Sequence, residues 1–100
     1  MKKDDRDDLV AVLNLVADSQ IIEDPEFETI FGRTRDEFRE MADRFEQETF
    51  FPDDVRMALS HVSWILMYPG ASKSITSRIE VTRYQLESLH GTLREMQEGP

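Results

Sequence analysis

The chain has no cysteine, and only four of its 100 residues are glycine. Without cysteine it can form no disulfide scaffold, no thiolate metal site and no cysteine nucleophile. Nucleophile elbows and phosphate-binding loops need glycines at fixed spacings, and neither pattern is present. These absences leave no recognisable catalytic motif. The sequence therefore predicts a protein that is not an enzyme and that needs no cofactor.

The pattern of histidine and carboxylate residues does not favour a metal site. Glu87 and His90 have the spacing used in di-iron carboxylate bundles, but such sites need a second pair and two further glutamates. The other histidine, His61, has no glutamate three residues before it. The four aspartates within residues 4–8 lack the glycine turn and the terminal glutamate of a calcium loop. We therefore predict no bound metal ion and interpret these aspartates as a solvated helix start.

Long apolar runs are also missing. The longest covers residues 9–17 with one interruption, which is far short of the roughly 20 residues that span a bilayer. Lys2 and Lys3 precede this run as in a signal peptide, but four aspartates follow them and no small-residue cleavage site is present. The sequence predicts a mature helix in a cytoplasmic protein that has no membrane segment.

Basic residues are few, because 12 lysines and arginines stand against 21 carboxylates and the formal net charge is −9. No lysine or arginine lies between residues 7 and 32. This charge argues against direct binding to DNA or RNA, whose phosphates it would repel. A basic protein would be attracted, although a solvated face that only keeps the chain soluble is the simpler interpretation. The candidate partner-binding carboxylates are Asp18, Glu23, Asp24, Glu26 and Glu28.

Helix-capping and helix-stopping residues divide the chain into five predicted helices joined by short loops. We expect helices at residues 5–18, 24–31, 35–48 and 52–68, and a long one from Ser72 or Ser74 to Gln97. Thr34 and Glu37 match a capping box, and Pro69-Gly70 ends the fourth helix. No segment alternates apolar and polar residues over a strand length. The sequence thus predicts an all-α fold, a four- to five-helix bundle with a long C-terminal helix, in a single domain with frayed ends at about 1–4 and 98–100.

All six phenylalanines lie between residues 27 and 51, mostly at helical spacing, which is typical of a core. Phe50 and Phe51 are the exception, because neighbouring residues in a loop do not easily face the same way. We expect one of these two rings near the surface.

The C-terminal segment carries a mostly apolar stripe with an average spacing of three and a half residues. Its members are Ile75, Ile79, Thr82, Leu86, Leu89, Leu93 and Met96. Either the stripe packs within its own bundle, or part of it pairs two subunits. Acidic partners for the flanking arginines are missing, and Gly91 weakens the helix. An autonomous coiled coil is therefore not expected.

The segment 52–68 carries two apolar faces. The second face holds Met57, His61, Trp64 and Tyr68, rotated away from the first. Such a helix either lies centrally or offers its second face to another protein, because aromatic and methionine side chains are enriched at interfaces.

The surplus of apolar helical surface leads to the first functional hypothesis. It predicts a small non-enzymatic protein interaction module, self-associating as a homodimer. Its interface candidates are Met57, His61, Trp64, Tyr68, Ile79, Leu86, Leu89 and Leu93. The alternative is an acidic inhibitor, an immunity-type or nucleic-acid-mimicking protein, whose carboxylates bind a basic protein.

Overall fold

The structure is a computed structural model of the chain, and it describes residues 1–18, 24–67, 70, 73 and 81–98. The chain is all-α, as the sequence predicts, and the regular elements of the described residues are five helices. These are α1 (Lys3–Asp18), α2 (Asp24–Phe31), α3 (Arg35–Glu46), α4 (Pro52–Met67) and α6 (Arg83–Glu98). None of the helices in these ranges is long and apolar enough to cross a membrane.

The ends of α3 follow local chemistry closely. The predicted capping box is present: the Glu37 amide donates to Thr34 Oγ1 at 3.2 Å, and the Thr34 amide donates to Glu37 Oε1 at 3.0 Å. The helix ends at Glu46, two residues earlier than predicted. The reason is the left-handed backbone of Glu48, with φ of 59°, which turns the chain so that the Thr49 amide donates to the Arg44 carbonyl.

The predicted C-terminal helix is not continuous. Lys73 is helical, but Val81 and Thr82 lie outside any helix, and α6 begins at Arg83. Thr82 caps it, because the Thr82 amide donates to Gln85 Oε1 at 2.7 Å and the Gln85 amide donates to Thr82 Oγ1 at 3.1 Å. This is a second capping box, with glutamine in place of glutamate. Among the described residues, the helical part of the stripe therefore starts at Leu86.

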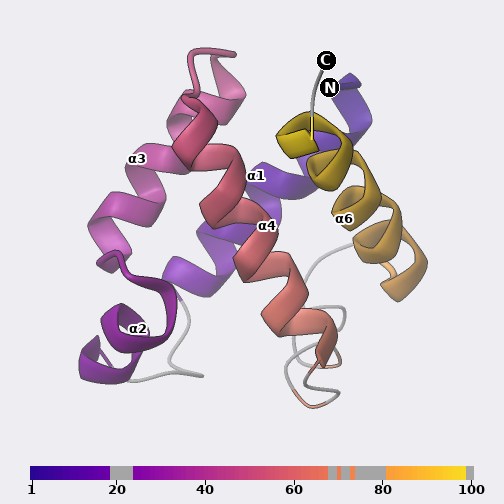
Figure 1. Ribbon diagram of the computed structural model, residues 1–100. Helices are drawn as coiled ribbons and strands as arrows, with labels where there is room; N and C mark the ends of the chain where they lie inside the picture. Colours follow the sequence, from indigo (N-terminus) through magenta and orange to yellow (C-terminus); the bar gives the residue numbers. More distant parts are fainter. Residues whose placement is uncertain (19–23, 68–69, 71–72, 74–80, 99–100) are drawn as a thin grey trace.

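Two antiparallel helix pairs and the short α2 make up the described fold (Figure 1). Arg6 near the start of α1 pairs with Glu48 just beyond α3 at 3.0 Å, so these two helices run in opposite directions. Arg83 at the start of α6 donates to the Leu66 carbonyl near the end of α4, which makes the second pair antiparallel as well. In Figure 1, α1 passes behind α4, and α2 lies below α3.

The core lies between these pairs and contains the phenylalanines predicted for it. Phe27, Phe31, Phe38 and Phe45 are buried. Of the two loop phenylalanines, Phe50 is half-buried and stacks on Phe45, with ring centroids 4.7 Å apart. Phe51 is 61% exposed, which confirms that one of this pair lies at the surface.

Candidate functional site

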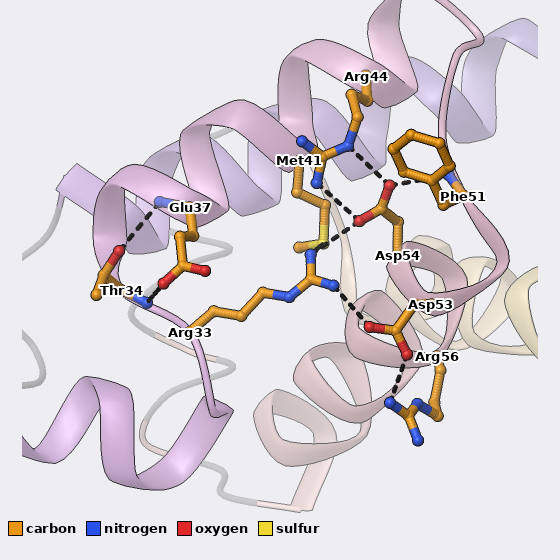
Figure 2. Close-up of polar contacts among 9 residues, drawn as sticks. All are labelled: Arg33, Thr34, Glu37, Met41, Arg44, Phe51, Asp53, Asp54 and Arg56. Carbon is orange, nitrogen blue, oxygen red and sulfur yellow. Dashed lines mark hydrogen bonds and ion pairs between the residues drawn. The ribbon is translucent and has the colours of Figure 1, made fainter.

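A buried carboxylate joins three parts of the fold at the start of α4 (Figure 2). Asp54 is 1% exposed. It accepts two hydrogen bonds from Arg44 of α3, both at 2.8 Å, and one from Arg33, at 2.8 Å, in the turn before α3. The backbone amide of Phe51 completes the set at 2.9 Å. The cluster therefore fixes α4 against α3 and against the turn that follows α2.

The contacts of Asp54 also fix its charge. Burial alone would raise its pKa, but the hydrogen bonds from Arg44, the Phe51 amide and Arg33 outweigh burial and hold the pKa of this carboxyl well below its usual range. Asp54 is thus ionised whenever the protein is folded near neutral pH. Its neighbour Asp53 faces outward and pairs with Arg33 and Arg56. This cluster was not predicted from the sequence, because Arg33 and Arg44 lie 21 and 10 residues before Asp54.

The other two arginines of this region turn toward the C-terminal end of α1. Arg35 Nη1 donates to the carbonyl oxygens of Val16 and Ala17 at 3.2 and 3.1 Å. Arg39 donates to the Ala17 carbonyl and pairs with Asp18 at 2.7 Å. The last carbonyls of a helix have no partner within the helix, and cations stabilise that end. Because α1 has no basic residue in its last turn, α3 supplies these cations.

These contacts leave a carboxylate-rich surface on α2, on α3 and just beyond α3. All four arginines between residues 24 and 50 make contacts within the fold, although the Arg39 side chain is still 43% exposed, and this stretch has no lysine. Its exposed charged side chains are therefore mostly acidic. We define the carboxylate-rich surface by its eight exposed members: Glu26, Glu28, Asp36, Glu37, Glu40, Asp43, Glu46 and Glu48.

The structure places the predicted acidic candidates in different surroundings. Glu26 and Glu28 belong to the carboxylate-rich surface, and Asp18 is exposed but pairs with Arg39. Asp24 lies at the start of α2, and only its backbone is described. Glu23 lies outside the described residues. Arg39 of α3 thus partly neutralises the predicted acidic segment, which runs from Asp18 to Glu28. Most of the exposed carboxylates lie further along the chain.

The predicted apolar interface residues that are described lie in or against the core of the chain. His61, Leu86, Leu89 and Leu93 are 0% exposed, so the chain's own helices cover them, as in the alternative in which these faces pack within the bundle. Met57 and Trp64 are half-buried and pack against the same core. Tyr68 and Ile79 lie outside the described residues. The physical reason is that α6 packs lengthwise on α4, while α2 covers the second face of α4.

His61 has an unusual environment for an imidazole. Its ring lies edge-on to Phe31 and Phe38, with centroids 4.6 and 5.0 Å apart, and neither ring nitrogen has a hydrogen-bond partner. Burial lowers the pKa of His61 to about 3, so the side chain is neutral in the folded protein near neutral pH. A neutral imidazole enclosed by aromatic rings functions here as a core residue.

The remaining histidine links the second helix pair. Ser63 Oγ on α4 lies 2.8 Å from His90 Nε2 on α6, within hydrogen-bond distance. A serine nucleophile needs a base that is itself oriented by a third group. No carboxylate is hydrogen-bonded to His90 among the contacts of the described residues. Within the same ranges no three histidine or carboxylate side chains converge closely enough to hold a metal ion.

Comparison of the chain with protein-family models, with curated proteins and with solved structures finds no match.

Proposed function

We propose that this protein is a non-enzymatic binding module that holds a basic protein partner on its carboxylate-rich surface. One observation carries the proposal: eight exposed carboxylates lie between residues 24 and 50, whereas all four arginines of that stretch are held in contacts within the fold. A surface made this way is negative and held in one shape by the same contacts.

The contacts of individual carboxylates support this role. Glu26, Glu28, Glu40, Asp43 and Glu46 take part in no side-chain hydrogen bond or ion pair within the described residues. Such side chains can meet lysines and arginines of another protein without first breaking a contact. A predominantly negative field also speeds the encounter with a partner of opposite charge. These are the properties expected of an acidic inhibitor of the immunity type or of a nucleic-acid mimic.

A pair of charge-matched variants tests the proposal. The surface variant carries Glu40→Gln, Asp43→Asn and Glu46→Gln on α3. The control carries Glu87→Gln, Glu95→Gln and Glu98→Gln on α6, so that both change the net charge from −9 to −6. Basic proteins retained from a native extract by the wild-type protein are purified. Their association rates with all three forms are then measured at several salt concentrations.

We expect a saturable complex whose association rate falls at least tenfold in the surface variant and much less in the control. That rate should also decrease steeply with salt, because screening removes steering. Equal slowing of both variants would mean that only total charge matters, and the proposal would then be wrong. It would also be wrong if no basic protein formed a complex of fixed stoichiometry.

Self-association, the other function predicted from the sequence, stays a prediction. The residues first expected to carry it include His61, Leu86, Leu89 and Leu93, and these are enclosed by the chain's own helices. A dimer would therefore have to form through a different surface.

A further inference from the structure

His61 of α4 is enclosed by aromatic rings from two other helices. Phe31 of α2 and Phe38 of α3 lie edge-on to the imidazole, with ring centroids 4.6 and 5.0 Å away. The side chain is fully buried, and neither ring nitrogen has a hydrogen-bond partner. A protonated imidazole has an N–H donor at each nitrogen, and these aromatic rings supply no acceptor for either. The enclosure therefore holds the neutral imidazole and disfavours the charged one.

No described carboxylate is placed to pair with a protonated His61. The described carboxylates of α2 and α3 all belong to the exposed carboxylate-rich surface; they are Glu26, Glu28, Asp36, Glu37, Glu40, Asp43 and Glu46. The other charged side chains of α3 and α4 contact one another, Arg33 or the end of α1; they are Arg35, Arg39, Arg44, Asp53, Asp54 and Arg56. Burial is accordingly the cause that lowers the pKa of His61, and no charged group offsets it.

The smallest part of this enclosure is α2. The helix has eight residues, and its described buried side chains are Phe27 and Phe31. Their rings meet Phe38 and Trp64 edge-on or tilted, and the Arg35 guanidinium lies over Phe27. The enclosing helix on the other side, α3, is held more firmly, by its capping box and by arginine contacts with α1 and α4. A short helix with few buried side chains opens locally at a lower free energy than such a helix.

Gly32 provides a place for the backbone to turn when α2 moves. Its φ of +73° lies in the left-handed region, which glycine adopts at little cost. Its amide donates to the Glu28 carbonyl at 2.7 Å and so closes the last turn of α2. The next residue, Arg33, is anchored on Asp53 and Asp54. Gly32 thus lies between a small helix and a fixed point, where a change of backbone angles moves α2 and leaves α3 in place.

We propose that α2 is an acid-sensitive flap: protonation of His61 favours a form in which α2 has moved away about Gly32 and the imidazolium is hydrated. In the closed form Phe31 covers the imidazole, and at neutral pH this form predominates. In the open form the aromatic side chains beneath α2 become accessible. The flap goes beyond the binding of a basic partner and does not depend on it.

The direction of the pH effect follows from the two environments of His61. Its pKa is about 3 under the closed flap and returns to about 6.5, the ordinary value, when the side chain is hydrated. Between these values the open form binds a proton that the closed form does not, so the ratio of open to closed forms rises as the pH falls. Between pH 7 and pH 5 this ratio should rise about 25-fold.

Amide hydrogen exchange, followed by NMR and corrected for the intrinsic exchange rate at each pH, tests the flap. The reporters are the Gly32 amide in the last turn of α2 and the amides of Met41 and Ala42 inside α3. At pH 7 we expect at least about tenfold less protection at Gly32 than in α3, because local opening precedes global unfolding. Protection at Gly32 should then fall about 25-fold by pH 5. Low concentrations of urea should change exchange at Gly32 much less than in α3, since opening one short helix exposes little surface.

Two variants separate the proton from the hinge. His61→Leu removes the titrating group, so protection at Gly32 should change less than about twofold between pH 7 and pH 5. Gly32→Ala places a side chain on a left-handed backbone, although the added methyl group meets only Met57 Cε at an ordinary 3.5 Å. It should raise opening about fivefold at both pH values and keep the 25-fold response, because backbone strain does not titrate.

Any of three results would overturn the flap. The first is a Gly32 amide with the same protection and urea dependence as α3, which would mean that α2 opens only with the whole chain. The second is equal protection at Gly32 at the two pH values. The third is a wild-type response in His61→Leu, which would assign the acid effect to carboxylates. The first two need only the wild-type protein, so they decide the matter even if a variant does not fold.

Discussion

Replacing His61 with leucine should stabilise the protein, and the gain should grow as the pH falls. The imidazole is fully buried and neither nitrogen has a hydrogen-bond partner. Removing a buried unsatisfied polar group is worth about 1–3 kcal/mol. Loss of the edge-on contacts with Phe31 and Phe38 should cost about 1 kcal/mol of this. We therefore expect a net gain of about 1 kcal/mol at pH 7, after these two opposing effects.

The pH dependence follows from the pKa of His61, which is about 3 in the folded protein against 6.5 for an ordinary histidine side chain. Below pH 6.5 the unfolded chain binds a proton that the folded chain does not, so stability decreases as the pH falls from 6.5 toward 3. Each pH unit below 6.5 is worth about 1.4 kcal/mol, which makes the wild-type loss about 2 kcal/mol between pH 7 and pH 5. His61→Leu removes this loss.

Urea unfolding at pH 7 and at pH 5 measures both effects. The single tryptophan, Trp64, lies 5.4 Å from the Phe31 ring, so its fluorescence reports on the same part of the core. The control is His90→Gln, which changes the other histidine and leaves His61 in place. The control should keep the wild-type loss of stability between the two pH values, to within about 0.5 kcal/mol.

The decisive quantity is the difference in unfolding free energy between His61→Leu and wild type, compared at the two pH values. If that difference is the same at pH 7 and pH 5, His61 takes up no proton on unfolding in this range. The buried, neutral state of His61 would then be refuted.

Three further substitutions test other parts of the fold by the same unfolding measurement. Asp54→Asn should destabilise the protein by about 3 kcal/mol at neutral pH, because it leaves Arg33 and Arg44 without their buried counter-charge. An unchanged free energy of unfolding would contradict the role of this cluster. Because the pKa of Asp54 is lowered by folding, its contribution is present above about pH 4 and is lost as the pH falls further, so the stability difference between wild type and Asp54→Asn should narrow in acid. Gly91→Ala should stabilise α6 by about 1 kcal/mol, since an added methyl group meets nothing within 4 Å. Gly32→Ala should destabilise the protein by about 1 kcal/mol, because the backbone angle φ at Gly32 is +73°. If Gly91→Ala and Gly32→Ala had similar effects on stability, the backbone described at Gly32 would be contradicted.

The limits of sequence reasoning are clearest at the C-terminal helix. Thr82 was counted as one position of a continuous stripe, whereas the structure makes it the cap of α6. The signal was present, because threonine followed three residues later by glutamine is a capping-box pattern. Apolar spacing alone does not reveal a break, since residues on either side of a loop can keep the same period.

The candidate site was predictable only in part. Glu26 and Glu28 were expected on an acidic face, and both are exposed there. The larger share of the carboxylate-rich surface lies on α3, where arginines and carboxylates alternate along the sequence. Nothing in that alternation shows that the arginines are the residues withdrawn from solvent. Arg44 and Arg33 reach Asp54 across 10 and 21 residues of chain, and Arg35 reaches Val16 across 19.

By itself, the sequence determined that the chain is all-α, where most of the helices lie and which phenylalanines are buried. Caps, prolines and periodic apolar positions act over a few residues, so the helices that they specify can be predicted directly from the sequence. Only the tertiary structure decided that the chain's own helices cover His61 and the apolar residues of α6. It also decided that the outward charge of α2 and α3 is mostly negative. Both depend on which helices pack together, because a side chain's exposure is set by neighbours that are distant along the chain.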